Sequence, residues 1–463
     1  MYRTIQCYIK QNSRLTPYCR DICDASAKLY NRANYILRQY ATAVDAFSCF
    51  KPLHKNQMEV FRLVQDVLGG TKYLGDNKWL SYNALDHLLK VTHDRAYYSL
   101  PSQANQQILK LLVRDYKAFF RALEAYKSSP SLFTGKPRIP KYSKGLKTSI
   151  LTNQICTIKD EKYLKLPGTK TRLNLGRIEG SLKEVRIKPS NRRFIVYAVV
   201  DVEDIGIVPA DNDVLLKEFK EMTDISGLRI LSIDPGTNNI AAVANNFGEK
   251  PVLIKGGVIK SINQLYNKEL ARLSSAAKIC NGRYRTKRMN VLTDKRNRRI
   301  KDQLHKISRQ IADYARDNGV DIVVMGHNVF QKQEIDIGHV SNQNFVQIPM
   351  TIFAGMLKYK LAAYGIRFVT TEESYTSQAD FLAEDEIPVY RRGDKVTYIF
   401  SGERIKRGLY VHCNGTISNA DINGAANIMR KVFPKVTQWD RGIVNMPCSI
   451  GYKQPEGSCR KAA

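Results

Sequence analysis

The chain is short of acidic side chains and has no long apolar run. Its 463 residues contain 73 Lys and Arg but only 43 Asp and Glu, which gives a formal net charge of +30. No apolar stretch approaches the roughly 18 residues that a transmembrane helix needs, and the opening stretch MYRTIQCYIK lacks the apolar core of a signal peptide. We therefore expect no membrane-spanning segment, and the positive charge predicts a polyanionic partner, with nucleic acid favoured over an anionic membrane.

The nine cysteines are scattered along the chain and form no C-x-x-C pair. Scattered cysteines in a chain without an export signal favour a reduced cytoplasmic compartment over a disulfide framework. The hydrophobic content of 43% is ordinary for globular proteins, and a chain of this length has room for two or three domains. We therefore expect a cytoplasmic protein of several domains, each with its own core.

The N-terminal part of the chain carries strand patterns on both sides of a helical segment. Residues 1–17 contain a strand with alternating apolar and polar positions, and residues 128–204 contain several short strands separated by turn residues. Between them, residues 18–127 carry apolar side chains at helical spacing. We expect the strands to close into a small β-barrel, with residues 18–127 as a helical insertion.

Two stretches are rich in basic residues and poor in acidic ones. In the first, Lys136, Arg138 and Lys141 alternate with aromatic residues, which suits phosphate contacts and base stacking as well as an ordinary solvated loop. The second opens a helix predicted at 285–318 and has Asp294 as its only acid, whereas solvated helix faces usually mix both signs. We therefore favour nucleic-acid contacts for the second stretch. Its arginines are Arg283, Arg285, Arg288, Arg296, Arg298 and Arg299.

The C-terminal half has the pattern of an α/β domain. Residues 205–226 are polar and mixed in character, and we expect them to be a linker. In residues 227–432, apolar strand patterns alternate with helical ones, which is typical of a mixed sheet flanked by helices. We expect residues 433–463 to form a C-terminal tail.

Three carboxylates lie where predicted strands or helices end. Asp234 ends the apolar run 228–233, Glu373 follows the strand predicted at 365–371, and Asp421 lies near the start of a predicted helix. An α/β sheet gathers such side chains at one edge, where they repel one another unless cations neutralise them. Hard divalent ions such as Mg²⁺ prefer oxygen ligands, and two of them about 4 Å apart hydrolyse phosphodiesters. For Asp234 alone, capping of the following turn is the alternative.

The segments around these carboxylates resemble known motifs. The stretches I-D-P-G-T-N-N at 233–239, E-S-Y-T-S at 373–377 and D-I-N-G-A-A-N-I at 421–428 are similar to the RuvC motifs of the TnpB family. The stretches L-Y-N-R-A at 29–33 and F-T-G-K-P-R-I-P-K-Y at 133–142 extend the resemblance to the N-terminal half. TnpB proteins are transposon-encoded, RNA-guided DNA endonucleases that resemble the ancestors of type V CRISPR effectors.

The resemblance implies a multidomain α+β fold and a set of partners. It implies a wedge-type β-barrel with an inserted helical recognition region, followed by a RuvC nuclease domain of RNase H-like fold. Two Mg²⁺ or Mn²⁺ ions would be held by Asp234, Glu373 and Asp421. The implied partners are a guide RNA and double-stranded target DNA, bound by a monomer within a ribonucleoprotein. The implied location is cytoplasmic, in association with the nucleoid.

The chain departs from the family pattern at the second catalytic acid. Most TnpB proteins carry this acid in a V-V-E-D-L stretch, whereas the equivalent residues here are VVMGH at 323–327. Some relatives, and the eukaryotic Fanzor proteins, carry a relocated Glu just before the Y-T-S segment. Glu373 fits that pattern, and Glu372 is the alternative. Because successive side chains of a strand point to opposite faces, only one of the two can face the metals.

A second departure concerns zinc. Most relatives hold a four-thiolate zinc knuckle in the insertion that corresponds to residues 378–418 here. By alignment, the four cysteine positions are Asp380, Ala383, Val411 and Asn414. We therefore expect no structural zinc, and a loop held instead by packing of aromatic residues. Those aromatic residues are Tyr390, Tyr398, Phe400 and Tyr410.

Three functions compete with the favoured one of a guided nuclease. The chain could be a guided repressor that occupies DNA without cutting, but a repressor has no need of Asp234, Glu373 and Asp421. It could be a type V CRISPR effector, whose motifs are similar. It could be a transposase, although no Tyr or Ser recombinase motif with supporting context is present.

Overall fold

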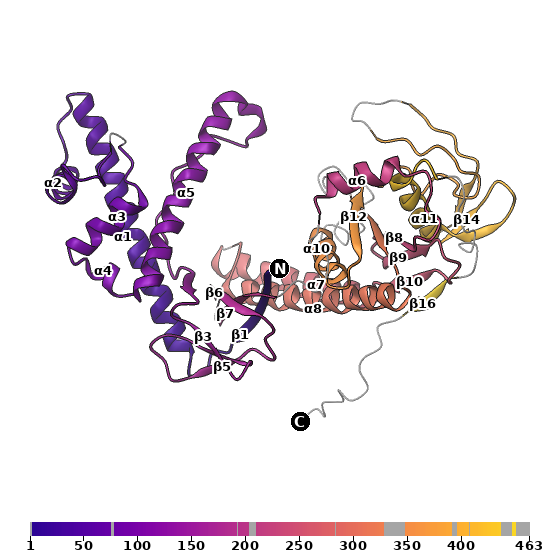
Figure 1. Cartoon of the computed structure of the whole chain (residues 1–463), viewed down its shortest axis with the longest axis horizontal. Helices are drawn as coiled ribbons and strands as arrows, with labels where there is room; N and C mark the ends of the chain where they lie inside the picture. The colour runs from indigo at the N-terminus through magenta and orange to yellow at the C-terminus, as the bar shows by residue number, and fades with distance from the viewer. Residues whose placement is uncertain are drawn as a thin grey trace. The chain divides into compact units, whose positions relative to one another are not determined.

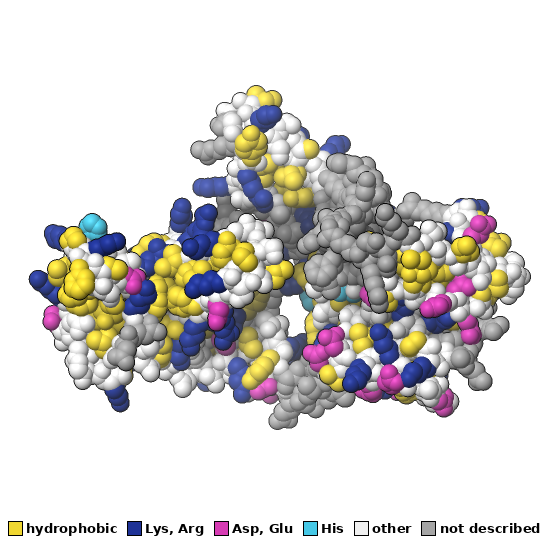
Figure 2. All heavy atoms as spheres, turned by 90° about the horizontal axis from the view of Figure 1, so that it is seen from above, with side chains coloured by type: hydrophobic (Ala, Val, Ile, Leu, Met, Phe, Trp, Pro, Cys, Tyr) yellow, Lys and Arg dark blue, Asp and Glu magenta, His cyan; other side chains and the backbone are white. Residues whose placement is uncertain are grey.

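The computed structural model of the chain divides into two compact units, Met1–Glu203 and Asp204–Ala463 (Figure 1). It describes residues 2–75, 78–191, 193–202, 210–282, 284–327, 348–390, 396–406, 408–436 and 447–450. None of the helices in these ranges has the length and apolar character needed to span a bilayer. Figure 2 shows many Lys and Arg side chains with few Asp and Glu on the visible face of the first unit, and a mixture of both signs on that of the second.

The first unit is built around two long helices. Helices α1 and α5 pack against each other because each carries buried apolar residues at a spacing of three or four, such as Ala33 and Leu37 on α1 and Leu112 and Tyr116 on α5. The shorter helices α2, α3 and α4 complete this helical region. The helices are α1 (Thr16–Ser48), α2 (Lys55–Leu68), α3 (Tyr82–Val91), α4 (Arg95–Tyr98) and α5 (Ser102–Ser128), followed by the short 3₁₀ helix η1 (Pro130–Leu132).

The strands of the first unit form two separate sheets. One has the order β1-β7-β6-β2 and is antiparallel throughout, and the other has the order β3-β4-β5. The expected closed barrel is absent from the described strands, because β3, β4 and β5 are three residues long and pair only with one another. The strands are β1 (Tyr2–Ile9), β2 (Ser149–Thr152), β3 (Thr157–Lys159), β4 (Tyr163–Lys165), β5 (Arg172–Asn174), β6 (Ser181–Ser190) and β7 (Arg193–Asp201).

The second unit contains the mixed sheet that the sequence predicted. Its strand order is β12-β11-β8-β9-β10-β16. Strands β8, β9 and β10 form an antiparallel meander, β11 and β12 run parallel to β8 on its other side, and β16 runs parallel to β10. The strands are β8 (Ile230–Asp234), β9 (Asn239–Asn245), β10 (Val252–Lys255), β11 (Ile322–Gly326), β12 (Arg367–Thr371) and β16 (Cys448–Ile450).

Helices cover both faces of this sheet. One face packs against α7 (Gly257–Asn281), α8 (Lys287–Asp317) and α10 (Met350–Ala362), and the other against α6 (Asn212–Glu221) and α11 (Ala420–Val432). Leu231 and Ile233 belong to the first core, whereas Ile230 belongs to the second. Because side chains alternate along a strand, Asp234 falls on the α11 face.

Two segments expected to lie outside this domain are part of it. Helix α6 forms inside the expected linker 205–226, and its Phe219 stacks on Phe433 from the expected tail, with ring centroids 5.4 Å apart. The tail also supplies β16, which extends the sheet. A helix of ten residues has only a few apolar side chains on one face, and in this segment they stand among polar residues. The polar composition of residues 205–226 therefore indicated a linker where a helix forms.

The insertion before α11 contains a small antiparallel sheet of its own. Strand β14 lies in its middle, and β15 leads directly into α11. This sheet is the element that delivers the chain to the start of α11. The strands are β13 (Glu403–Lys406), β14 (Leu409–Val411) and β15 (Ile417–Asn419).

Candidate active site

Asp234 lies at the end of the central strand β8, where the chain turns into β9. It pairs with Ala242 across the β8–β9 hairpin. The turn between them is tight, because a Cβ placed on Gly236 would come within 2.8 Å of the carbonyl oxygen of Asn239. Pro235 and Gly236 therefore form the turn of the β8–β9 hairpin, with the Asp234 carboxylate where the first strand enters the turn.

The first turns of α11 lie against Asp234. Asn419 caps the helix by accepting hydrogen bonds from the backbone N–H groups of Asp421 and Ile422 at 3.0 and 3.3 Å. A Cβ placed on Gly424 would come within 2.8 Å of Asp234 Oδ2. This glycine allows the helix to approach closely enough to set Asp421 beside Asp234.

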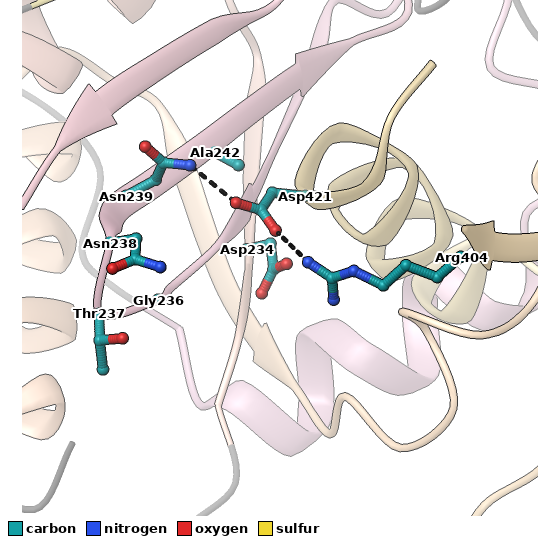
Figure 3. A pocket seen from close by; sticks show the side chains of 8 residues that line it. All are labelled: Asp234, Gly236, Thr237, Asn238, Asn239, Ala242, Arg404 and Asp421. Carbon is teal, nitrogen blue, oxygen red and sulfur yellow. Dashed lines mark hydrogen bonds and ion pairs between the residues drawn. The ribbon is translucent and has the colours of Figure 1, made fainter. Parts of the chain in front are cut away.

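Asp234 and Asp421 line one cavity of about 390 Å³ (Figure 3). Asn239 donates from Nδ2 to Asp421 Oδ2 at 2.7 Å, and the Arg404 guanidinium donates to Asp421 Oδ1 at 3.4 Å. Figure 3 shows Asp421 between these two side chains, with Asp234 next to it. The residues that line the cavity are Asp234, Gly236, Thr237, Asn238, Asn239, Ala242, Arg404 and Asp421.

The carboxylates disfavour one another's negative charge. Burial raises the pKa of Asp234 well above its usual value, the charges of Glu373 and then Asp421 raise it further, and only Arg404 opposes them. An ionised Asp234 therefore needs more positive charge than Arg404 supplies.

Glu373 lies close enough to Asp234 for its charge to raise the pKa of that carboxyl, although it is not among the residues that line the cavity. Gly326 pairs with Thr371 at the end of β12, and Met325 before it pairs with Ile233, the residue before Asp234. A Cβ placed on Gly326 would come within 2.7 Å of Glu373 Oε2. The Glu373 side chain thus lies over Gly326, at the end of the strand that corresponds to the V-V-E-D-L stretch.

Glu372 is engaged elsewhere. One of its carboxylate oxygens forms an ion pair with the ammonium of Lys431, and the other accepts a hydrogen bond from the backbone N–H of Ser374 at 2.8 Å. The Lys431 side chain is only 5% exposed, whereas that of Glu372 is 33% exposed, so the ammonium is the shielded partner of the pair. Of the two adjacent glutamates, Glu373 is the one that faces Asp234.

The donor chemistry of the carboxylates fits hard divalent ions. Asp234 is flanked by two further carboxylates that raise its pKa, and oxygen ligands of this kind are those that such ions prefer. Within the described ranges, however, no three His, Cys, Asp or Glu side chains are arranged so that they could hold one ion together. Arg404 supplies part of the positive charge that divalent ions would bring.

Sequence reasoning missed Arg404 altogether. It lies on the exposed strand β13, and its side chain is 43% exposed. Nothing in the local pattern distinguishes it from the other basic residues of the insertion. Only the folding of the small sheet against α11 brings it to Asp421.

The arginines of the second basic stretch differ in their surroundings. Arg285, Arg288 and Arg299 are exposed, as expected for phosphate contacts. Arg296 instead donates from Nε to the buried Asn263 of α7 at 2.8 Å, so it fastens α8 to α7. Arg298 is half-buried and donates to a backbone carbonyl of its own helix. Arg283 lies outside the described residues.

The first basic stretch is an extended segment held against α1. Lys136, Arg138 and Lys141 are all exposed. The segment is anchored by Asn31, whose side-chain amide donates to the carbonyl of Ser143 at 3.0 Å and accepts from its N–H at 2.7 Å. The L-Y-N-R-A motif of α1 thus anchors the segment that carries these exposed cations.

The four positions that correspond to the family's zinc-binding cysteines do not form a zinc site among the described residues. Asp380 is fully buried and bonds the ring of His412, next to Val411, at 2.5 Å between Oδ1 and Nδ1. Sequence reasoning gave His412 no role in the insertion, and this contact corrects it. Ala383 and Asn414 have side chains that do not ligate zinc in proteins.

The expected aromatic packing of the insertion is correct in part. The rings of Tyr398 and Phe400 pack on Tyr375, at centroid distances of 5.0 and 6.2 Å. Tyr410 is fully buried and donates to the carbonyl oxygen of Gln378 at 2.7 Å. Tyr390 is 59% exposed, so its assignment to the packing is wrong.

We predict that the purified protein contains no stoichiometric zinc. The ligand positions hold Asp380, Ala383, Val411 and Asn414, and Asp380 is already bonded to His412. Elemental analysis of protein purified without chelators provides the measurement. About one tightly held zinc per chain, the stoichiometry of a knuckle, would contradict the prediction.

Two family models match the second unit. Residues 218–331 match the family described as a probable transposase, OrfB_IS605, and residues 351–428 match the Cas12f1-like TNB domain. The first match contains Asp234 and Gly326, and the second contains Glu373 and Asp421. No curated protein matches the chain.

Several solved structures are distantly similar. The Cas12f1–sgRNA–target DNA complex has 15% identity and a TM-score of 0.45, over 90% of this chain and 83% of that one. The mini-RNA-guided endonuclease CRISPR-Cas_phi3 has 11% identity and a TM-score of 0.41, over 94% and 92%. C2c1 of Alicyclobacillus acidoterrestris with single-guide RNA has 10% identity and a TM-score of 0.33, over 90% and 70%. TM-scores below 0.5 make these likenesses distant.

The family models fall on the segments that carry the motifs. The OrfB_IS605 match spans the I-D-P-G-T-N-N stretch, and the TNB match spans the E-S-Y-T-S and D-I-N-G-A-A-N-I stretches. Over residues 218–331 and 351–428 the chain is therefore similar to a transposase family and to the Cas12f1-like TNB domain, in agreement with the resemblance of its motifs to those of TnpB proteins.

Proposed function

We propose that this chain is an RNA-guided DNA endonuclease, associated with a transposable element, that cuts DNA beside a short flanking motif. The observation that carries the proposal is the convergence of Glu373 and Asp421 on Asp234, from three distant segments, in a protein of net charge +30. The matches to the two family models over residues 218–331 and 351–428 support it. The observed strand order, a three-stranded meander followed by two parallel strands on its other side, supports a RuvC domain of RNase H-like fold.

The proposed domain organisation follows the sequence boundaries with two changes. Residues 1–17 and 128–204 form the wedge, and residues 18–127 form the helical recognition region. The nuclease domain extends beyond 227–432, because α6 and β16 pack into it. The insertion at 378–418 belongs to that nuclease domain.

In the proposed mechanism, Asp234, Glu373 and Asp421 would hold two Mg²⁺ or Mn²⁺ ions. Such ions would polarise the scissile phosphate and lower the pKa of the attacking water. Asn239 fixes the orientation of Asp421 through its 2.7 Å hydrogen bond. Arg404, which is 43% exposed and lines the same cavity, is placed to contact a phosphate of the substrate.

The proposed partners are a guide RNA and double-stranded target DNA. The exposed cations of the two basic stretches would contact their phosphates, while base pairing would read the target sequence. We assign this contact to Lys136, Arg138, Lys141, Arg285, Arg288 and Arg299. Arg296 and Arg298 are left out because both are half-buried and donate to groups of α7 and α8. We propose a single copy of the chain in the ribonucleoprotein.

We predict that the exposed arginines of the second stretch set part of the salt dependence of nucleic-acid binding. Changing Arg285, Arg288 and Arg299 together to Gln should flatten the plot of log affinity against log salt concentration. Removing each phosphate contact should reduce the slope by about 0.7–0.9. Fluorescence anisotropy of labelled RNA over a range of KCl concentrations measures the slope.

A matched variant controls for the removal of three charges. Lys306, Arg316 and Lys435 each form an ion pair with a neighbouring carboxylate, and changing all three to Gln removes the same number of cations. The control should keep the wild-type slope. Equal slopes for the two triple variants would mean that the arginine stretch is only a solvated face.

The proposed activity is tested with the ribonucleoprotein purified from cells that express the chain together with the region flanking its gene. Sequencing of the copurified RNA identifies the guide, and a plasmid that matches it is incubated with Mg²⁺ or with EDTA. Cleavage with Mg²⁺ alone supports the nuclease. Guided binding without cleavage would instead identify a repressor, and joined DNA products would identify a transposase. A guide transcribed from a CRISPR array would identify a type V effector.

A further inference from the structure

A buried chain of three side chains crosses the insertion that precedes α11. His412 contacts Asp380 Oδ1 through Nδ1 at 2.5 Å and Ser418 Oγ through Nε2 at 2.7 Å. Asp380, His412 and Ser418 are exposed by 0, 3 and 5%. Three polar residues so well shielded from water are held by one another, because each loses its hydration on folding.

The acid end of this chain is further fixed by the backbone. Asp380 accepts hydrogen bonds from the N–H groups of Cys413 at 2.7 Å and Leu382 at 2.8 Å. Burial by itself raises the pKa of Asp380, but the hydrogen bond from His412 and those from the backbone outweigh it, and the pKa lies below its usual value. Asp380 is therefore a charged anchor for the histidine.

The serine end leads straight to the candidate active site. Ser418 lies in the middle of β15 and pairs with Tyr410 of β14. The next residue, Asn419, is the N-cap of α11, and Asp421 lies in the first turn of that helix. A displacement of Ser418 therefore moves the residue that caps the helix on which Asp421 depends.

The acid end leads to Glu373 in the same way. Glu373 and Asp380 are the first and last residues of one segment, 373–380. Two asparagines of α11 hydrogen-bond to the backbone of this segment. Asn427 donates to the carbonyl of Thr376 at 3.0 Å, and Asn423 donates to the carbonyl of Ala379 at 2.8 Å. The buried chain thus joins the segment of one candidate ligand to the segment of another.

The order Asp–His–Ser is also that of a hydrolytic triad. Here the serine hydroxyl is enclosed, and Ser418 as a whole is only 5% exposed. A nucleophile must be reachable by its substrate, so a second catalytic centre does not fit these residues.

We propose that Asp380, His412 and Ser418 act as positioning residues that set Asp421 relative to Glu373, an inference that rests on the proposed metal-dependent function. Loosening the hydrogen bonds among these three side chains leaves the carboxylates of Asp421 and Glu373 present but misplaced. The metal requirement should therefore rise, while binding of guide and target is unchanged.

The test uses Ser418→Ala and His412→Gln in the full ribonucleoprotein. Ser418→Ala removes the hydrogen bond between His412 and Ser418. In His412→Gln, the new side chain can reach Ser418 but not Asp380. Both should need about five to ten times more Mg²⁺ for half-maximal cleavage, the change expected from one hydrogen bond of ordinary strength. The Mg²⁺ concentration that gives half of the metal-induced rise in unfolding temperature should increase by a similar factor, and target affinity should stay at the wild-type value.

Ser401→Ala is the matched control. Ser401 lies in the same insertion and donates to Asp385 Oδ1 at 2.5 Å, but it does not lead into α11. This variant should keep the wild-type Mg²⁺ dependence. If Ser418→Ala matches Ser401→Ala in the Mg²⁺ titrations of both cleavage and unfolding temperature, the three buried side chains have only a structural role and the proposal is wrong.

The cleavage assay and the thermal titration also separate the positioning role from the proposed nuclease function. A wild-type protein that is stabilised by Mg²⁺ but does not cut would contradict the nuclease, while the shift of the thermal titration in Ser418→Ala still decides the positioning role. A wild-type protein that is not stabilised by Mg²⁺ would contradict the metal centre, and the positioning role would be overturned with it.

Discussion

Changing Asp234 to Asn should abolish DNA cleavage and leave binding of guide and target unchanged. Asp234 is flanked by Glu373 and Asp421, so it is the central carboxylate of the three that would hold the metal ions. Removing one group that stabilises charge in the transition state typically costs roughly 10²–10³ in rate, and removing this carboxylate should cost at least that much. Single-turnover cleavage and filter binding of the same ribonucleoprotein separate the two effects.

The same substitution should stabilise the metal-free protein. Burial and the two neighbouring charges raise the pKa of Asp234, which means that its ionised form is unfavourable in the fold. Asn removes that charge at nearly the same volume, and each kcal/mol relieved should raise the unfolding temperature by about 2–4 °C in a domain of this size. Differential scanning fluorimetry in EDTA measures the rise.

Added Mg²⁺ gives the complementary readout. It should stabilise the wild-type protein but not Asp234→Asn, because a ligand stabilises only the state that binds it. Asp302→Asn changes an exposed acid on α8 and serves as the control, with wild-type behaviour expected in every assay. Full cleavage by Asp234→Asn, or an equal Mg²⁺ response in both proteins, would contradict the assignment.

Changing Glu373 to Gln should lower the cleavage rate by roughly 10²-fold or more with little effect on target affinity. The reason is the contact with Gly326, where any side chain would meet Glu373 Oε2 at 2.7 Å. The glutamate fills the place next to Asp234 that an acid at position 326 would otherwise occupy. Glutamine keeps the shape of the side chain and removes its charge, so rate and affinity should separate.

Glu372→Gln is the matched control for this prediction. Glu372 pairs with Lys431, so its replacement leaves a buried ammonium without its partner and should lower stability rather than the cleavage rate. An inactive Glu372→Gln beside an active Glu373→Gln would reverse the assignment of the two residues.

Gly326 allows a direct exchange of ligand positions. Gly326→Ala alone should displace Glu373 and slow cleavage, since the new Cβ has no space. Returning the acid to β11 with Gly326→Glu and Glu373→Ala also requires room beside Ile428, whose Cδ1 would lie 2.7 Å from the new Cβ. Adding Ile428→Val to that pair provides the room and should restore part of the cleavage rate.

The sequence was informative wherever a local pattern determines the structure. The apolar run 228–233 predicted a buried strand ending in a carboxylate, and the Pro-Gly pair after it is a turn signal. The parallel pairing of β11 with both β8 and β12 then explains why Asp234 and Glu373 come together, since Asp234 ends β8 and Glu373 follows β12 at the same edge of the sheet. Both stretches carried strong local patterns, and family motifs marked the acids.

The sequence was uninformative wherever long-range contacts decide. Arg404 reaches Asp421 only because β13 folds onto the edge of β14, and a lone arginine in a polar loop has no distinctive spacing. His412 gives no local sign that Asp380 will bond it across 32 positions. The expected barrel failed for a related reason, because strands of three residues carry too little pattern to reveal their partners.

A guide exchange tests the central claim most directly. Two ribonucleoproteins are prepared with guides that differ only in the segment that pairs with DNA, and each is incubated with Mg²⁺ and both matched plasmids. The account predicts that each complex cuts only the plasmid that its own guide matches, and that Asp234→Asn cuts neither while still binding the matched one. Cleavage that ignores the guide, or no cleavage of either plasmid by the wild-type complexes, would contradict it.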